Sequence, residues 1–87
     1  MPMEKQKIDY EFRNQLFDLH ITPHLGYVYK ICISHARAPD HIPELNNEVL
    51  TALLKGIMTY DPSLPALPWI LTVAKRHIRK IYSKKVF

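Results

Sequence analysis

Cysteine and glycine are scarce in this sequence. Cys32 is the only cysteine among 87 residues, so the chain has no disulfide framework and no thiol-rich metal site. Its two glycines, Gly26 and Gly56, are too few for a glycine-rich phosphate-binding loop. No apolar run approaches the roughly 18 residues of a membrane span, and the N-terminus lacks a signal-peptide core. These absences favour a cytoplasmic protein that does not contact a membrane.

Negative charge is missing from the C-terminal part of the chain. From Trp69 onward all charged residues are basic, so the net charge of +4 divides into −2 before this residue and +6 after it. Such a polarity is typical of a surface that binds phosphates. The alternative is an ordinary basic face that only contacts solvent.

Apolar residues recur at helical spacing in four segments. The apolar share of 47% and the charged share of 23% are those of a folded globular domain, and the length allows one such domain. We expect residues 1–8 to be a flexible leader and residues 9–85 to form a compact all-α bundle of three to four helices. Residues 86–87 are expected to start a linker or a truncated end.

The helix boundaries are marked by capping residues and prolines. Thr22 is suited to cap a second helix, with Pro23 at its first position, and this helix runs toward His35. Pro43 is expected to begin the third helix, with Glu44 in its first turn, where a negative charge complements the helix dipole.

A proline-rich loop, residues 61–68, connects the third helix to the fourth and has few conformations. Gly56, which costs ~1 kcal/mol relative to alanine in a helix interior, indicates that a side chain packs closely there. Trp69 opens the fourth helix on the same flank as Arg76 and Lys80, an arrangement that suits base stacking beside neutralised phosphates. The sequence leaves open the alternative that Trp69 folds back on the loop as a core anchor.

Catalytic and metal-binding motifs are missing. His20 and His24 have the spacing of a helical metal pair, but Pro23 interrupts the helix between them and no third ligand is evident. His35 and His77 lie on apolar faces and are expected to be semi-buried. The sequence therefore predicts no enzyme activity, no metal and no cofactor.

Three motifs follow one another in the second half of the chain. They are Glu44-Leu45-Asn46-Asn47-Glu48-Val49-Leu50, Tyr60-Asp61-Pro62-Ser63, and Pro68-Trp69-Ile70-Leu71-Thr72-Val73-Ala74-Lys75-Arg76. In this order they resemble region 2 of bacterial sigma factors, especially the small extracytoplasmic-function (ECF) type, and the resemblance covers about residues 12–85. It implies a transcription-initiation domain that binds core RNA polymerase and recognises and melts the promoter minus-ten element.

The resemblance implies two binding surfaces. The polymerase-binding surface, which meets the β′ clamp helices, comprises Glu44, Asn47, Glu48 and, by adjacency, Thr51 and Lys55. The DNA-binding surface, which holds the single-stranded minus-ten element, comprises Asp61, Ser63, Trp69, Thr72, Lys75, Arg76, Arg79 and Lys80. In the family the loop accepts a flipped base. The resemblance also allows an anti-sigma factor as a regulatory partner.

The chain departs from the family pattern at several positions. Asn47 replaces the usual glutamine and Glu44 the usual aspartate, while Arg76 and Lys80 replace a common asparagine and a common aspartate. The DNA-facing helix is therefore more basic than is usual. No helix-turn-helix region 4 is encoded, so we expect an excised domain, with a natural protein that works with region 2 alone beside another subunit as the alternative. The alternative function is a helical protein-interaction module with a basic solvent face and no direct role in DNA binding.

Overall fold

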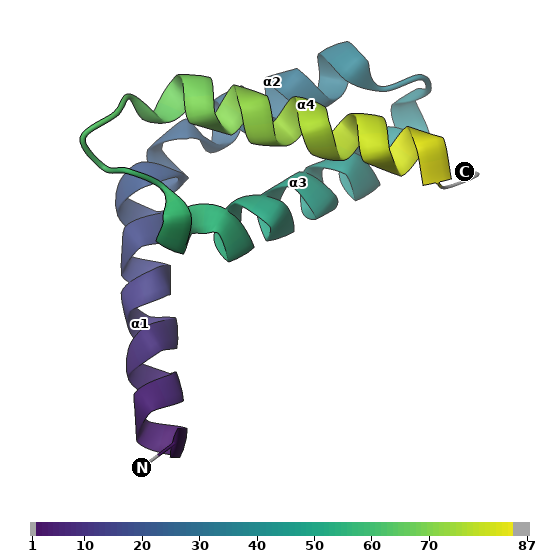
Figure 1. Ribbon diagram of the computed structural model, residues 1–87. Helices are drawn as coiled ribbons and strands as arrows, with labels where there is room; N and C mark the ends of the chain where they lie inside the picture. The colour runs from purple at the N-terminus through teal and green to yellow at the C-terminus, as the bar shows by residue number, and fades with distance from the viewer. Residues whose placement is uncertain (1, 85–87) are drawn as a thin grey trace.

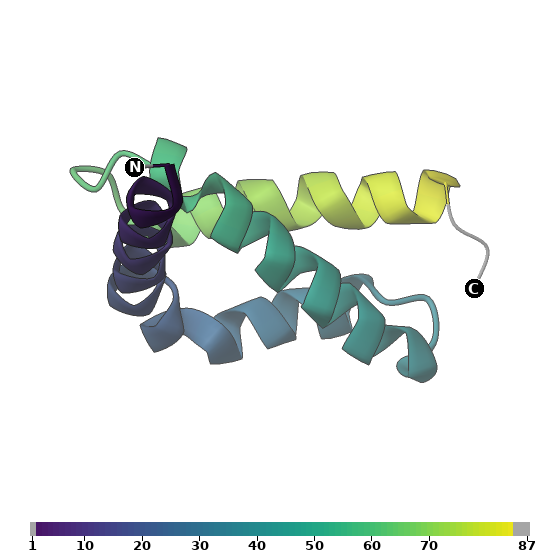
Figure 2. The ribbon, with the colours of Figure 1, turned by 90° about the horizontal axis from the view of Figure 1, so that it is seen from below.

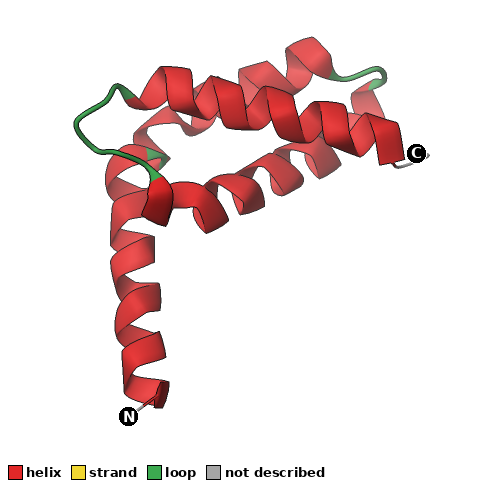
Figure 3. Cartoon of the chain, viewed as in Figure 1, coloured by secondary structure: helices red, strands yellow, loops and turns green. Residues whose placement is uncertain are grey.

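The computed structural model describes residues 2–84, and in this range it contains helices, turns and loops but no strand (Figures 1 and 3). The helices are α1 (Pro2–His20), α2 (Leu25–His35), α3 (Ile42–Gly56) and α4 (Ala66–Lys84), with short 3-10 turns η1 (Thr22–His24), η2 (Pro39–His41) and η3 (Ile57–Thr59). The expected all-α bundle is confirmed. No helix within the described range is both long and apolar enough to cross a membrane.

Three of the helices form the body of the bundle. α2 and α4 run alongside each other and α3 crosses them obliquely, as Figure 2 shows. The C-terminal end of α1 packs against η1, η3 and α3, and the rest of α1 projects away from the body (Figure 1). The loop between η3 and α4 therefore lies where α1 meets the bundle.

The core collects one side of α2, α3 and α4, while α1 contributes only partly buried side chains, and none of the polar or charged residues described in 10–84 is classed as buried. Its members are Ile21, Val28, Ile31, Cys32, Leu45, Val49, Leu53, Ile57, Tyr60, Ile70, Ala74, Ile78 and Ile81. Their spacing of three and four residues puts them on one face of α3 and of α4. Each fully buried Leu, Ile or Val contributes about 1.5–3 kcal/mol relative to an exposed position.

Two details of the expected helix boundaries are wrong. α1 begins at Pro2, so residues 2–8, expected as a leader, are helical. Proline fits the first position of a helix, and the residues that follow it are good helix formers. Thr22 does not cap α2 but lies inside η1, where its hydroxyl donates to Asp18 Oδ1 at 3.1 Å. α2 starts two residues later than expected, at Leu25.

A third boundary, the start of the fourth helix, is also wrong: α4 begins at Ala66 rather than at Trp69, so the last part of the expected loop, with Pro68, forms its first turn. Proline is tolerated there because the N–H groups of a first turn have no partner within the helix. The start of α3 is as expected. α3 has a proline in its first turn together with Glu44, which confirms the predicted start at Pro43 to within one residue. On α4, His77 is partly buried, as expected. Residues 86–87, the expected start of a linker, lie outside the described residues.

Gly56 ends α3 directly beneath the indole of Trp69. A methyl group at its Cα would lie 3.5 Å from Trp69 Cζ2, which is ordinary van der Waals contact. The expected close packing at this glycine is confirmed, and its partner is the only tryptophan of the chain. One carbon therefore fits here in contact with the indole.

Gly56→Ala is expected to stabilise the fold by about 0.5 kcal/mol, because alanine loses less backbone entropy and fills contact space beside Trp69. Gly56→Val is expected to destabilise it by about 1–3 kcal/mol, because its extra methyl groups displace the indole. Urea unfolding followed by Trp69 fluorescence measures both. Equal destabilisation by the two substitutions would show that the indole does not limit the space at this position.

Candidate nucleic-acid interface

Tyr60 lies at the centre of a row of three aromatic rings. Its ring centroid is 5.2 Å from that of His20, edge to face, and 4.9 Å from that of Trp69 at an interplanar angle of 37°. The Tyr60 hydroxyl donates a hydrogen bond to the carbonyl oxygen of Leu64. One buried side chain thus connects the end of α1, the proline loop and the start of α4.

A tight turn shapes the first half of the loop. Asp61 Oδ1 accepts hydrogen bonds from the backbone N–H of Ser63 at 2.9 Å and from its hydroxyl at 2.7 Å. The N–H of Leu64 donates to the Asp61 carbonyl at 3.0 Å. The Ser63 hydroxyl and then the Ser63 backbone N–H lower the pKa of Asp61, because both bonds favour the charged carboxylate. The two predicted residues Asp61 and Ser63 therefore hold each other in place.

A pocket of about 450 Å³ opens between this loop and the first turns of α4. It is lined by Thr59, Tyr60, Asp61, Leu64, Pro65, Pro68, Trp69 and Thr72. Thr72 donates a hydrogen bond to the Pro68 carbonyl at 2.9 Å, which fixes its rotamer. We call this the loop pocket. Apolar rings and prolines form most of its lining, and Asp61 supplies a hydrogen-bond acceptor, so it suits a flat ligand with polar edges.

Trp69 packs on the core, which is one of the two interpretations that the sequence left open, while base stacking stays a prediction. Its ring is partly buried and packs against the core, Tyr60 and Gly56. The same residue lines the loop pocket. It is therefore an anchor of the fold that also offers a surface to a ligand.

The basic residues of α4 are exposed but do not share one environment. Lys75 and Arg79 line a groove between α2 and α4, whereas Lys80 lines a hollow between α3 and α4. Arg76 lies on the solvent side and lines neither of them. The flank expected to carry Trp69, Arg76 and Lys80 together is thus divided among separate sites.

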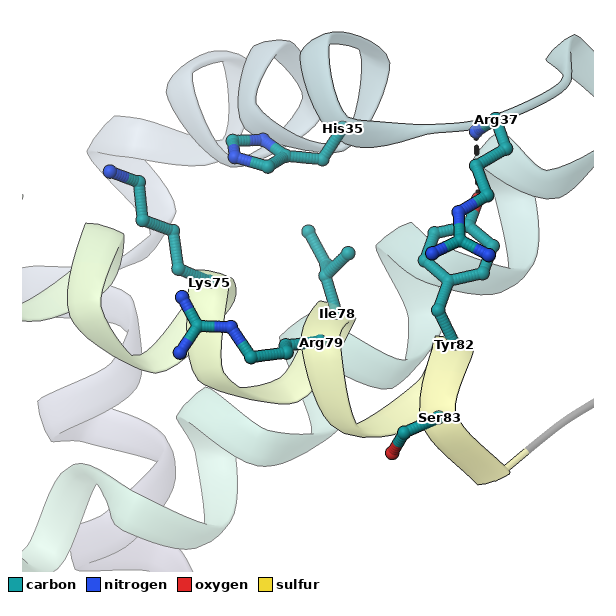
Figure 4. Close-up of a pocket in the computed structure, with 7 residues that line it drawn as sticks. All are labelled: His35, Arg37, Lys75, Ile78, Arg79, Tyr82 and Ser83. Carbon is teal, nitrogen blue, oxygen red and sulfur yellow. Dashed lines mark hydrogen bonds between the residues drawn. The ribbon is translucent and has the colours of Figure 1, made fainter.

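The groove between α2 and α4, which we call the α2–α4 groove, has a volume of about 500 Å³ (Figure 4). It is lined by His35, Arg37, Lys75, Ile78, Arg79, Tyr82 and Ser83. His35, expected to be semi-buried, is exposed at this groove, and its Nδ1–H donates a hydrogen bond to the Ile31 carbonyl of its own helix at 2.9 Å.

The polar side of α3 is exposed as the sequence indicated. Asn47, Glu48, Thr51 and Lys55 are exposed and Glu44 is partly exposed. Glu48 lines the hollow of about 260 Å³ between α3 and α4 together with Lys80 and Lys84. The expected polymerase-binding and DNA-binding surfaces therefore meet at this hollow.

Sequence reasoning missed residues that reach the interface from other elements. Arg37 and Tyr82 line the α2–α4 groove, and the backbone N–H of Arg37 donates to the Tyr82 hydroxyl at 2.8 Å across 45 residues of sequence. Tyr60, which the sequence analysis did not assign to either binding surface, lines the loop pocket. No local pattern in the sequence links positions so far apart.

No metal-binding cluster occurs among the described residues. His20 instead packs edge to face on Tyr60. The single thiol, Cys32, is buried, and burial raises its pKa by penalising the thiolate. The thiol is thus a core group in its neutral form.

Comparison of the chain with protein-family models, with curated proteins and with solved structures gave no match. The family assignment is therefore a proposal that rests on the sequence motifs and on the geometry described above.

Tyr60→Phe is expected to lower the free energy of unfolding by about 1 kcal/mol, because it removes the hydrogen bond to Leu64 while keeping the ring contacts. Urea unfolding followed by circular dichroism measures this loss. Tyr29→Phe is the matched control, since Tyr29 is exposed on α2. Equal stability of the two variants would contradict a structural role for the Tyr60 hydroxyl.

Proposed function

We propose that this chain is region 2 of an ECF-type sigma factor. In this proposal it binds core RNA polymerase through α3 and holds the single-stranded minus-ten element with the proline loop and α4, without catalysing a reaction. The observation that carries the proposal is the loop pocket. It is formed by the segment that resembles the base-accepting loop of the family, and it lies at the start of the basic helix.

The rigidity of the loop pocket suits the capture of an unstacked base. Extruding a base from a duplex costs a few kcal/mol. Stacking of that base on an aromatic side chain offsets this cost by about 1–3 kcal/mol per base. If the pocket had to become ordered on binding, the entropy lost by its residues would cancel part of this stacking free energy. Here Pro65 and Pro68 restrict the backbone, and Tyr60 and Asp61 hold the turn by hydrogen bonds.

The polymerase contact is assigned to the exposed polar side of α3. Its apolar side is occupied by the core through Leu45, Val49 and Leu53, so this helix can offer a partner only its other face. Asn47 and Thr51 lie one helical turn apart in the middle of that face. A cytoplasmic location follows from a polymerase partner.

A mixed-sequence single-stranded promoter oligonucleotide is expected to quench the fluorescence of Trp69, because a base in the loop pocket contacts the indole. Trp69 is the only tryptophan, so the signal reports on this pocket alone. The duplex of the same sequence is the control and should leave the emission nearly unchanged. No response to the single strand, alone or with polymerase present, would remove the evidence for base capture.

Asn47→Lys is expected to weaken capture by a β′ clamp-helix fragment at least about tenfold, because it places a charge in the centre of the assigned interface. Gln15→Lys is the matched control, since Gln15 is an exposed amide on α1. Pull-down with wild type and both variants measures the effect. Equal capture of all three proteins would contradict the assigned face.

A protein-interaction module without a DNA role is the second candidate. It is favoured by Leu25, Tyr29 and Ile33, which lie four residues apart on α2 and are 41%, 46% and 47% exposed. Apolar side chains at this spacing form a stripe suited to a partner helix. This candidate predicts no response of Trp69 to single-stranded DNA, so the fluorescence titration distinguishes the two functions.

A further inference from the structure

The α2–α4 groove gathers positive charge from two different helices. Lys75 and Arg79 lie one turn apart on α4, and Arg37 follows the end of α2 on the opposite wall (Figure 4). Ile78 lies between the two walls. Among the described residues that line the groove, none is acidic. No carboxylate in the described lining compensates the positive charges, so the potential within the groove is positive.

Tyr82 holds Arg37 in place. The backbone N–H of Arg37 donates to the Tyr82 hydroxyl at 2.8 Å, and the guanidinium carbon lies 4.2 Å from the centre of the Tyr82 ring. His41 Nδ1 is 2.9 Å from the same hydroxyl. Stacking uses the face of the guanidinium and leaves N–H donors at its edge. Arg37 is thus oriented before any ligand binds, unlike an ordinary surface arginine.

A phosphate group fits this arrangement. The planar fork of the Arg37 guanidinium matches two phosphate oxygens, and Arg79 and Lys75 add positive charge from α4 further along the groove (Figure 4). The groove also continues the surface of the loop pocket, since Thr72 lines the pocket and Lys75, one turn further along α4, lines the groove. At the 1.5 Å rise of a helix, Trp69 and Arg79 are about 15 Å apart along α4, the length of about four stacked nucleotides.

We propose that the α2–α4 groove binds a backbone phosphate of the same nucleic-acid strand that places a base in the loop pocket. Arg37, outside every motif on which the proposed function rests, is its decisive residue. The inference rests on the proposed function and adds the segment after α2 to the nucleic-acid surface.

The test compares Arg37→Gln with Lys30→Gln, which removes an exposed charge from α2 outside the groove. Binding of a fluorescein-labelled single-stranded 12-nucleotide oligonucleotide is followed by anisotropy at several salt concentrations. Arg37→Gln is expected to raise Kd roughly twofold to tenfold and to reduce the salt slope by about 0.7. Lys30→Gln should match wild type.

Arg37→Lys separates charge from geometry. It keeps one positive charge but loses the stacked fork, so the salt slope should return to the wild-type value while Kd stays above it. Thermal unfolding of each variant confirms that the comparison is between folded proteins. Wild-type Kd and slope in Arg37→Gln would overturn the inference.

The outcomes distinguish this inference from the proposed function. If Trp69 fluorescence responds to the oligonucleotide but Arg37→Gln has no effect, the groove assignment fails alone. If neither responds, both fail. Inorganic phosphate is titrated separately and followed by amide NMR shifts of Arg37 and Lys75. Shifts with phosphate but none with the oligonucleotide would assign the groove to a small phosphorylated molecule and overturn the nucleic-acid source.

Discussion

The contacts of the Tyr60 ring determine how the other parts of this small domain meet. The ring lies between His20 at the end of α1 and Trp69 at the start of α4, and its hydroxyl holds the loop at Leu64. Through Trp69 the same stack reaches Gly56 at the end of α3. Three helices and the loop pocket therefore share one set of aromatic contacts, so the pocket cannot change shape without disturbing the packing around α1, α3 and α4.

The apolar composition of the core leaves the basic residues of α4 available for binding. Because none of the polar or charged residues described in 10–84 is classed as buried, the basic residues have no part in the core. Their environments are decided by the neighbouring helices. α2 supplies the second wall for Lys75 and Arg79, whereas α3 brings Glu48 beside Lys80. Cations that look equivalent on a helical wheel thus differ in what they can bind.

Features set by local sequence could be predicted, and features set by distant contacts could not. The apolar period and the prolines gave the helices, and the cost of glycine in a helix indicated the close packing at Gly56. The wheel could not show that Trp69 both packs on the core and lines a pocket, because that depends on where Tyr60 lies. Nor could it find Arg37, whose orientation depends on Tyr82 at the far end of the chain.

The placement of two sites on one helix has a physical consequence for the proposed complex. The distance between the loop pocket and the α2–α4 groove is fixed by the rise of α4. The bound strand therefore has to adapt its conformation to this spacing. Stacking in the pocket depends little on salt, while the phosphate contact in the groove weakens as salt rises. Base capture would therefore provide the binding that persists at high ionic strength, and the groove would mainly strengthen and orient the strand at low ionic strength.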